Sequence, residues 1–165
     1  MDAKKIYITP RGARSLREEL AYLWQDKRPK VTEQVRAAAA LGDRSENAEY
    51  QYGKRQLREI DRRIRYLQKR LDNITVVDRT PSDQTRVFFG AFVTLETEDA
   101  ESLSIRIVGE DEIDIARSWI SMHTPLARAI LGKSVGDEAR IQRPAGIITA
   151  EILSIHYEEM SAYDD

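Results

Sequence analysis

Two carboxylate side chains, Asp43 and Glu46, lie three residues apart in a short stretch between two strongly helical segments. Gly42 precedes them, and a glycine here is typical of the end of a helix. One interpretation is structural: Asp43 caps the next helix and Glu46 completes a capping box, each carboxylate satisfying a backbone N–H. The other is chemical: both carboxylates face outward as oxygen ligands for Mg²⁺. The spacing fits both interpretations.

The segments on either side must position these acids. Residues 13–41 repeat apolar side chains at helical spacing, and Pro29 is expected to kink this run. Residues from about 45 to 73 carry a heptad seam, which consists of Leu57, Ile60, Ile64, Leu67, Leu71 and Ile74. Two amphipathic runs joined by one turn predict an antiparallel helical hairpin with arms roughly 45 Å long. The hairpin places Asp43 and Glu46 at its tip.

The second helical segment is strongly basic away from its seam. Between Gly53 and Arg70 it holds eight Lys and Arg but only two acids. Side chains three or four residues apart share one side of a helix. The candidate phosphate-binding residues that step by three or four are Arg55, Arg58, Arg62, Arg65 and Lys69. The face is either the solvated outside of a coiled coil or a surface that follows a nucleic-acid backbone.

Two tyrosines stand next to the tip. Tyr50 and Tyr52 either stack on bases or pack between the helix ends, and packing is the favoured expectation for Tyr52. No nucleophile–base pair and no phosphate-binding glycine loop occurs in the chain. His123 and His156 lie far apart, without metal-ligand spacing around them. We therefore expect no complete active site within this protein.

Composition narrows the function classes. The 165 residues contain no cysteine, which excludes disulfides and thiolate chemistry. No apolar run approaches the length of a membrane span, and no secretory signal follows Met1, so a cytoplasmic location is expected. Residues 1–80 carry a balance of +7 and residues 81–165 a balance of −9. Two modules with different partners are indicated, the basic one facing a polyanion.

Beyond Pro81 the pattern changes from helices to strands. Strands are predicted at 87–95, 103–108, 119–122 and 147–155, and a short helix is predicted at 125–132. The predicted fold class is thus α+β, a long antiparallel coiled-coil hairpin followed by a small β-sheet domain with one short helix. The domains are predicted at 1–78 for the coiled coil, 79–85 for a linker, 86–158 for the globular domain and 159–165 for an acidic tail.

Three stretches resemble the bacterial Gre transcript-cleavage factors. They are L-G-D-R-S-E-N-A-E-Y at 41–50, I-V-G-E-D-E at 107–112 and S-M-H-T-P-L-A-R-A-I-L-G-K at 121–133. The residues Y-L-W at 22–24, R-P at 28–29 and R-E-I-D-R-R at 58–63 are similar to the GreB branch. The resemblance covers residues 6–157, nearly the whole chain.

The resemblance implies a function for each feature. The globular domain would have an FKBP-like fold and would bind RNA polymerase at the rim of its secondary channel. The coiled coil would enter that channel, where Asp43 and Glu46 share an Mg²⁺ with the polymerase and stimulate its cleavage of the RNA 3′ end in backtracked complexes. The protein would be a transcription elongation factor, not an enzyme, and a monomer that meets the RNA and DNA of the elongation complex.

The resemblance also implies that the basic face, with Lys54, Arg55, Arg58 and Arg62, lies toward the extruded RNA. The docking loop implied by the resemblance is the one around His123, Thr124 and Pro125. The family pattern has an acid or amide before Ser-Pro, whereas this chain has His123 and Thr124. Three other functions remain open. They are a non-cleaving regulator in the same channel, an autonomous nuclease or prolyl isomerase, and a nucleic-acid-binding coiled coil without polymerase.

Overall fold

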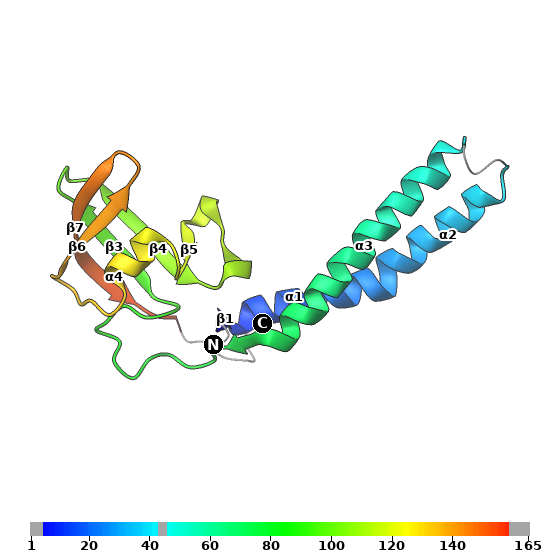
Figure 1. Cartoon of the computed structure of the whole chain (residues 1–165). Helices are drawn as coiled ribbons and strands as arrows, with labels where there is room; N and C mark the ends of the chain where they lie inside the picture. Colours follow the sequence, from blue (N-terminus) through cyan, green and yellow to red (C-terminus); the bar gives the residue numbers. More distant parts are fainter. Residues whose placement is uncertain (1–4, 43–45, 159–165) are drawn as a thin grey trace. The chain divides into compact units, whose positions relative to one another are not determined.

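The chain folds into two compact units. The computed structural model describes residues 5–42 and 46–158. One unit, Ala13–Ile74, is a helical hairpin, and the other joins the residues up to Gly12 with those from Thr75 onward into a globular unit built on a β-sheet (Figure 1). The predicted α+β class is confirmed. The segment before Ala13, expected within the coiled-coil domain, belongs by its contacts to the globular unit.

The first arm of the hairpin is one helical run with a widened turn inside it. Helix α1 spans Pro10–Tyr22, the π-helical turn η1 spans Leu23–Lys27, and α2 spans Arg28–Ala39. The N–H of Arg28 donates to the carbonyl of Leu23, five residues earlier. The ring of Pro29 would collide with the carbonyl four residues before it in a regular helix. The irregularity predicted at Pro29 therefore takes the form of a π turn just ahead of it.

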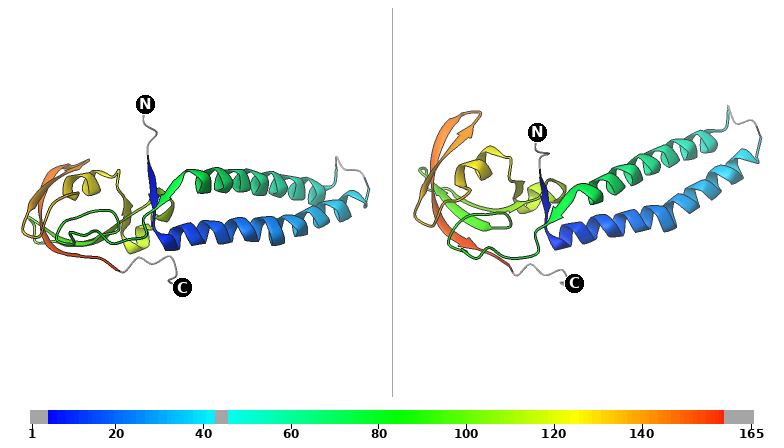
Figure 2. Two further views of the ribbon diagram at one scale, coloured as in Figure 1. Left: turned by 90° about the horizontal axis from the view of Figure 1, so that it is seen from below. Right: turned by 60° about the horizontal axis from the view of Figure 1, so that its bottom comes forward.

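The second arm is one continuous helix, α3, over Ala48–Asn73. It lies beside the first arm in both views of Figure 2. The heptad seam is confirmed, because Ile60, Ile64 and Leu67 are buried. Helix α3 begins at Ala48 rather than near residue 45.

Contacts between the arms run antiparallel, as predicted. Glu19 pairs with Arg63 at 2.8 Å, and Arg28 pairs with Asp61 at 2.7 Å. Towards the tip, Gly53 faces Val35 so closely that a Cβ on Gly53 would lie 2.7 Å from the Val35 Cγ2. Glycine thus lets the two helices approach each other just below the turn.

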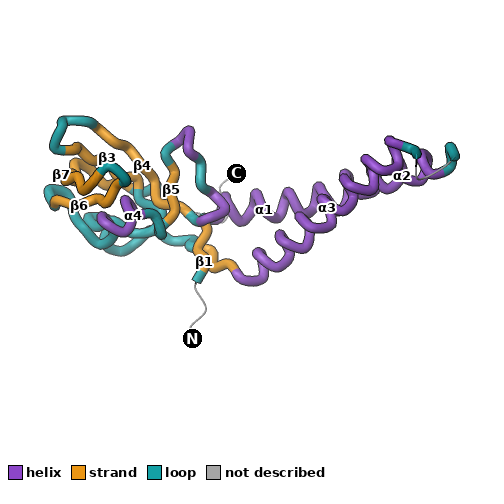
Figure 3. Tube along the Cα trace, turned by 45° about the horizontal axis from the view of Figure 1, so that its top comes forward, coloured by secondary structure: helices purple, strands orange, loops and turns teal. Residues whose placement is uncertain are grey.

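The globular unit contains a five-stranded sheet in the order β5-β4-β3-β7-β6 (Figure 3). Its strands are β3 at Phe92–Thr97, β4 at Ser102–Val108, β5 at Trp119–Ser121, β6 at Glu138–Arg143 and β7 at Gly146–His156. All neighbours pair antiparallel except β4 and β5, which are parallel. The short strands β1 (Ile6–Ile8) and β2 (Ile74–Val76) form a separate two-stranded sheet.

The core of this unit lies between the sheet and the short helix α4, Pro125–Ile130. Val93 and Leu95 on β3 are buried with Ile107 on β4, while their neighbours along each strand face the other side. Ala127 and Ile130 of α4 complete the cluster. Along β3 a period of two residues thus turns one face toward the core, whereas residues 105–108 of β4 are all buried, so both faces of that strand are covered.

One predicted strand begins later in the structure, and the strands β1, β2 and β6 were not predicted. Strand β3 begins at Phe92, not at residue 87, because the chain turns through Gly90 at a φ of +88°. Strand β6 was not predicted, although Ala139 and Ile141 alternate with polar neighbours along it. Its charged residues obscured that short signal.

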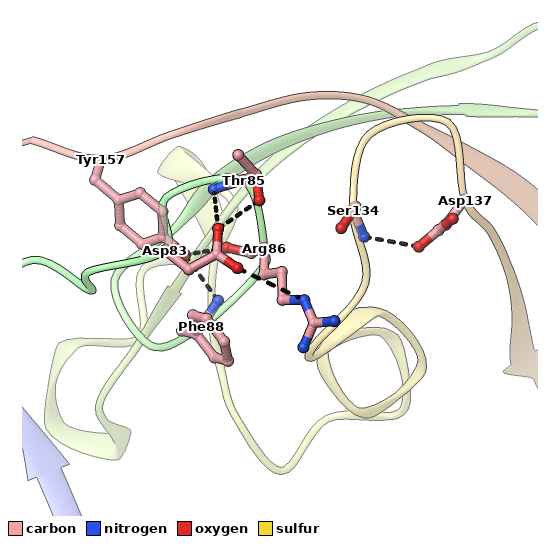
Figure 4. A network of polar contacts seen from close by, with 7 residues as sticks. All are labelled: Asp83, Thr85, Arg86, Phe88, Ser134, Asp137 and Tyr157. Carbon is pink, nitrogen blue, oxygen red and sulfur yellow. Dashed lines mark hydrogen bonds and ion pairs between the residues drawn. The ribbon is translucent and has the colours of Figure 1, made fainter.

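A polar network joins the loop before β3 to Tyr157, the residue that follows β7 (Figure 4). The Tyr157 hydroxyl donates to the Arg86 carbonyl and accepts from the Phe88 N–H at 2.8 Å. Asp83 accepts hydrogen bonds from both the hydroxyl and the N–H of Thr85, and these hold the pKa of its carboxyl below the usual range. Burial raises the pKa of the Tyr157 hydroxyl. The loop before β3 is therefore tied down by specific bonds.

Candidate functional site

Asn47 caps helix α3 at the tip of the hairpin. Its Oδ1 accepts from the N–H of Tyr50 at 3.1 Å, and its Nδ2 donates to the carbonyl of Ala38 at 2.7 Å. One side chain thus satisfies an orphan donor at the start of α3 and adds a second hydrogen bond to the Ala38 carbonyl, which also accepts from the N–H of Leu41 at 3.2 Å. The capping-box interpretation is therefore wrong for Glu46, which precedes the cap instead of occupying the third helical position.

The carboxylate of Glu46 is exposed. Within residues 5–42 and 46–158 it makes no hydrogen bond or ion pair, so its oxygens are available to a ligand. Asp43, the other predicted acid, lies outside the described residues. Across the described part of the chain, no group of three or more His, Asp or Glu side chains could hold a metal by itself. Glu46 suits a shared cation, since Mg²⁺ accepts one or two protein carboxylates and takes its other ligands elsewhere.

The turn that leads to these acids is sharp. Helix α2 ends at Ala39, and the N–H of Ala40 still bonds back to the Arg36 carbonyl at 3.2 Å. Gly42 has a φ of +140°, a conformation that residues with a Cβ rarely adopt. The glycine predicted to end the first arm therefore also allows the chain to turn before the acids.

The predicted basic residues lie on the outer side of α3. Lys54, Arg55, Arg58, Arg62 and Arg65 are all exposed, and their helical positions lie opposite the seam. We call Arg55, Arg58, Arg62 and Arg65 the arginine row. Among the described residues, no acid pairs with any of the four.

Other arginines of the hairpin behave differently. Arg63 and Arg28 form ion pairs across the arms, and the hydrogen bond with Asp61 raises the pKa of the Arg28 guanidinium. Such pairs neutralise charge beside the seam. The arginine row keeps its full charge, which is the requirement for binding phosphates.

The tyrosines near the tip do not follow the favoured expectation. Tyr52 is 63% exposed, so it does not pack between the helix ends. Tyr50 is half-buried, and the ammonium of Lys54 lies 5.3 Å from the centre of its ring. Packing thus describes Tyr50 and not Tyr52.

The predicted docking residues lie together at the start of α4. The Thr124 hydroxyl accepts from the N–H of Ala127 at 3.2 Å and donates to the Ser121 carbonyl at 2.9 Å, so Thr124 is the cap of this helix. Pro125 is its first residue and is exposed. The Nε2 of His123 lies 3.6 Å from the Oε1 of Glu110, and both side chains are about one-third exposed.

Asn47 and Gly53 are the residues that the sequence analysis missed. Asn is among the strongest caps, and Asn47 directly precedes the helical run, so this signal was present in the sequence. Gly53 is different, because its importance depends on Val35 in the other arm. No local pattern announces such a contact.

Two family models match consecutive parts of the chain, which together make up most of its length. One, described as "Transcription elongation factor, N-terminal", matches residues 6–76, and the other, "Transcription elongation factor, GreA/GreB, C-term", matches residues 82–157. Among the described residues, no helix is long and apolar enough to span a membrane.

Several relatives carry the name transcription elongation factor GreB. The protein of Pasteurella multocida is 55% identical over 157 residues, which cover 95% of this chain and 99% of the relative. That of Haemophilus influenzae is 54% identical over the same length and shares. That of Pseudomonas aeruginosa is 55% identical over 150 residues, 91% of this chain and 89% of the relative.

Solved structures of more distant proteins are also similar. Gfh1 of Thermus thermophilus is 22% identical, with a TM-score of 0.43 and coverage of 93% of this chain and 99% of that one. A GreA/GreB factor of Nitrosomonas europaea is 23% identical, with a TM-score of 0.42 and coverage of 93% and 100%. The family models and the GreB relatives span almost the whole sequence, and this chain therefore belongs to the GreA/GreB family of transcription elongation factors.

Proposed function

We propose that this elongation factor binds RNA polymerase and stimulates the polymerase's own cleavage of the RNA 3′ end in backtracked, arrested complexes. The observation that carries the proposal is the free carboxylate of Glu46 at the tip of the hairpin. Because Asn47 performs the capping, the acid is not needed for the helix. An exposed acid without a structural partner, three residues after Asp43 in the sequence, fits a role in a partner's active centre.

The chemistry requires a cation that polymerase and factor share. When bound, Mg²⁺ would activate the attacking water and stabilise the leaving oxygen of the phosphodiester. Asp43 and Glu46 would supply carboxylate oxygens that hold this ion and orient the water. Two carboxylates retain Mg²⁺ only weakly, so the site is complete only within the polymerase. The factor is then not an enzyme by itself.

The arginine row together with Lys54 would guide the displaced RNA. In a backtracked complex the RNA 3′ segment is single-stranded, and its phosphates are attracted by cations that have no acidic partner. The same side of α3 carries these cations from Lys54 to Arg65, about 17 Å at the rise of an α-helix. The row therefore extends away from the acids along several nucleotides.

The globular unit would dock on polymerase through the loop before α4. Thr124 is occupied as a cap, so its main contribution is to hold the loop's shape. His123 and the exposed Pro125 are the side chains left to meet the partner. The factor would act in the cytoplasm, as a monomer.

The test uses stalled elongation complexes with a labelled RNA, incubated with Mg²⁺ and the factor. Asp43→Asn should reduce cleavage sharply without changing the melting temperature. Glu49→Gln is the matched control, because it removes one exposed carboxylate from the first turn of α3. Equal cleavage by Asp43→Asn and the unaltered factor would contradict the metal role. Binding without any cleavage by the unaltered factor would instead identify a non-cleaving regulator of the secondary channel.

A further inference from the structure

Tyr52 is the most exposed tyrosine ring of helix α3. The residue is 63% exposed, against 42% for Tyr66 further along the helix. It is the fifth residue of α3, so it stands about 6 Å from the start of the helix at Ala48. A large ring is thus held in solvent, on a rigid element, close to the tip that carries Glu46.

The other two tyrosines of α3 already have cations against their rings. Lys54 lies 5.3 Å from the centre of Tyr50, and Tyr66 has Arg63 at 5.1 Å and Arg70 at 5.9 Å. Among the described residues, no cation or second ring covers Tyr52. Its π-face is therefore open to a flat partner from outside the chain.

The position of Tyr52 relative to the arginine row narrows the kind of partner. Arg55 follows Tyr52 by three residues, so their side chains are neighbours on the helix surface. Arg58 and Arg62 continue the row away from the tip. A partner that covers both features needs a flat group to stack on Tyr52 and a chain of negative charges to lie along the arginine row. A single-stranded nucleic acid has both, in its bases and its phosphates.

We propose that Tyr52 is a stacking platform for one base of the displaced single-stranded RNA 3′ segment. This inference rests on the function proposed above and adds a residue that positions the RNA. Stacking on one side chain contributes on the order of a tenfold change in binding and tolerates any base, since every base has a π-face. The ring fixes the register of the RNA, while the arginine row holds its phosphates.

The experiment measures cleavage rates at saturating factor, on backtracked complexes whose displaced RNA carries a single abasic nucleotide at successive positions. With the unaltered protein, an abasic nucleotide at one position should slow cleavage about tenfold. Tyr52→Leu should show the same loss on intact RNA and no further loss on the abasic RNA. Tyr52→Phe, which keeps the ring, should behave as the unaltered protein.

Tyr66→Leu is the matched control, because it removes a ring of the same helix that is covered by its own arginines. Tyr66→Leu should leave cleavage unchanged. The melting temperature should be the same for the Tyr52 and Tyr66 variants, because both positions are exposed. The inference is overturned if Tyr52→Leu cleaves intact RNA at the normal rate, or if the losses from the abasic nucleotide and from Tyr52→Leu multiply. Those results leave the proposed function in place. Absence of cleavage by the unaltered protein would overturn both.

Discussion

Helices α3 and α4 both begin with a side-chain cap, but the two caps have different consequences for function. Helix α3 begins after Asn47 at the tip of the hairpin, and helix α4 begins after Thr124 in the globular unit. Each cap accepts a hydrogen bond from an N–H three residues later and also donates to a carbonyl of the preceding segment. Each thereby closes the loop that leads into its helix.

The difference lies in which residue is left free. At the tip, capping by Asn47 leaves the acid before it, Glu46, without a structural task. In the globular unit the predicted docking residue Thr124 is itself the cap, so its hydroxyl is already used. Substitutions at the tip should therefore separate function from stability, whereas at Thr124 the two should change together.

The largest expected effect is that of Glu46→Gln on cleavage. The change removes a charged oxygen ligand and keeps the shape, so cleavage should fall by more than the roughly 10- to 100-fold that loss of an indirect metal contact costs. Stability should stay within about 0.5 kcal/mol, as for an exposed surface residue. Chemical denaturation alongside the cleavage assay measures both. A marked loss of stability would mean that Glu46 has a structural task after all.

Asn47→Ala should mainly lower stability, in contrast to Glu46→Gln, which should mainly lower cleavage. It removes two hydrogen bonds at the tip and should lower the free energy of unfolding of the hairpin by about 1–2 kcal/mol. Asn47→Asp keeps the acceptor for the Tyr50 N–H but loses the donor to the Ala38 carbonyl, so its effect should be intermediate. Urea unfolding followed by helical circular dichroism gives these values. Equal stability of all three proteins would show that another group caps α3.

Thr124→Ala should destabilise the globular unit by about 1 kcal/mol, the usual cost of a lost cap. Thr124→Ser keeps the hydroxyl and is the control. Unfolding can be followed by the fluorescence of Trp119 in a Trp24→Phe background, which confines the signal to this unit. If polymerase binding falls more for Thr124→Ala than its stability explains, Thr124 also contacts the partner.

The smallest effect on stability is expected for His123→Gln. The contact with Glu110 is 3.6 Å long and about one-third exposed, and such surface pairs contribute less than about 1 kcal/mol. Binding to polymerase should nevertheless weaken, because about one-third of the His123 side chain is exposed to a partner. Unchanged affinity in a competition assay with the unaltered factor would remove His123 from the docking surface.

Much of the fold followed from local patterns. The seam through Ile60, Ile64 and Leu67 was predicted because a long helix repeats its buried positions every three or four residues. The three-residue strands β1 and β2 were missed, since so short a segment carries no measurable period. Strand β6 alternates at Ala139 and Ile141, but its charged residues make so short an apolar signal weak.

The sequence predicted the residue types of the candidate site but not the exposure of every side chain in it. Its residue types came from the motif around Asp43 and Glu46, and the side of α3 that carries the basic residues came from helical geometry. The exposure of Tyr52 was predicted wrongly, because the space between two helix ends depends on how closely they approach. Here Gly53 against Val35 sets that approach, and the contact joins residues 18 positions apart in the sequence.

The sequence by itself determined two long amphipathic helices, a charged outer face and a glycine turn between them, because these depend on residues a few positions apart. The sequence offers both Asn47 and an acid as the cap of α3, and the tertiary structure decides for Asn47. Its amide donates to the Ala38 carbonyl in the other arm, a contact across the turn, and the Glu46 carboxylate before it is exposed. Hydrogen bonds between distant residues select among local alternatives that are otherwise close in free energy.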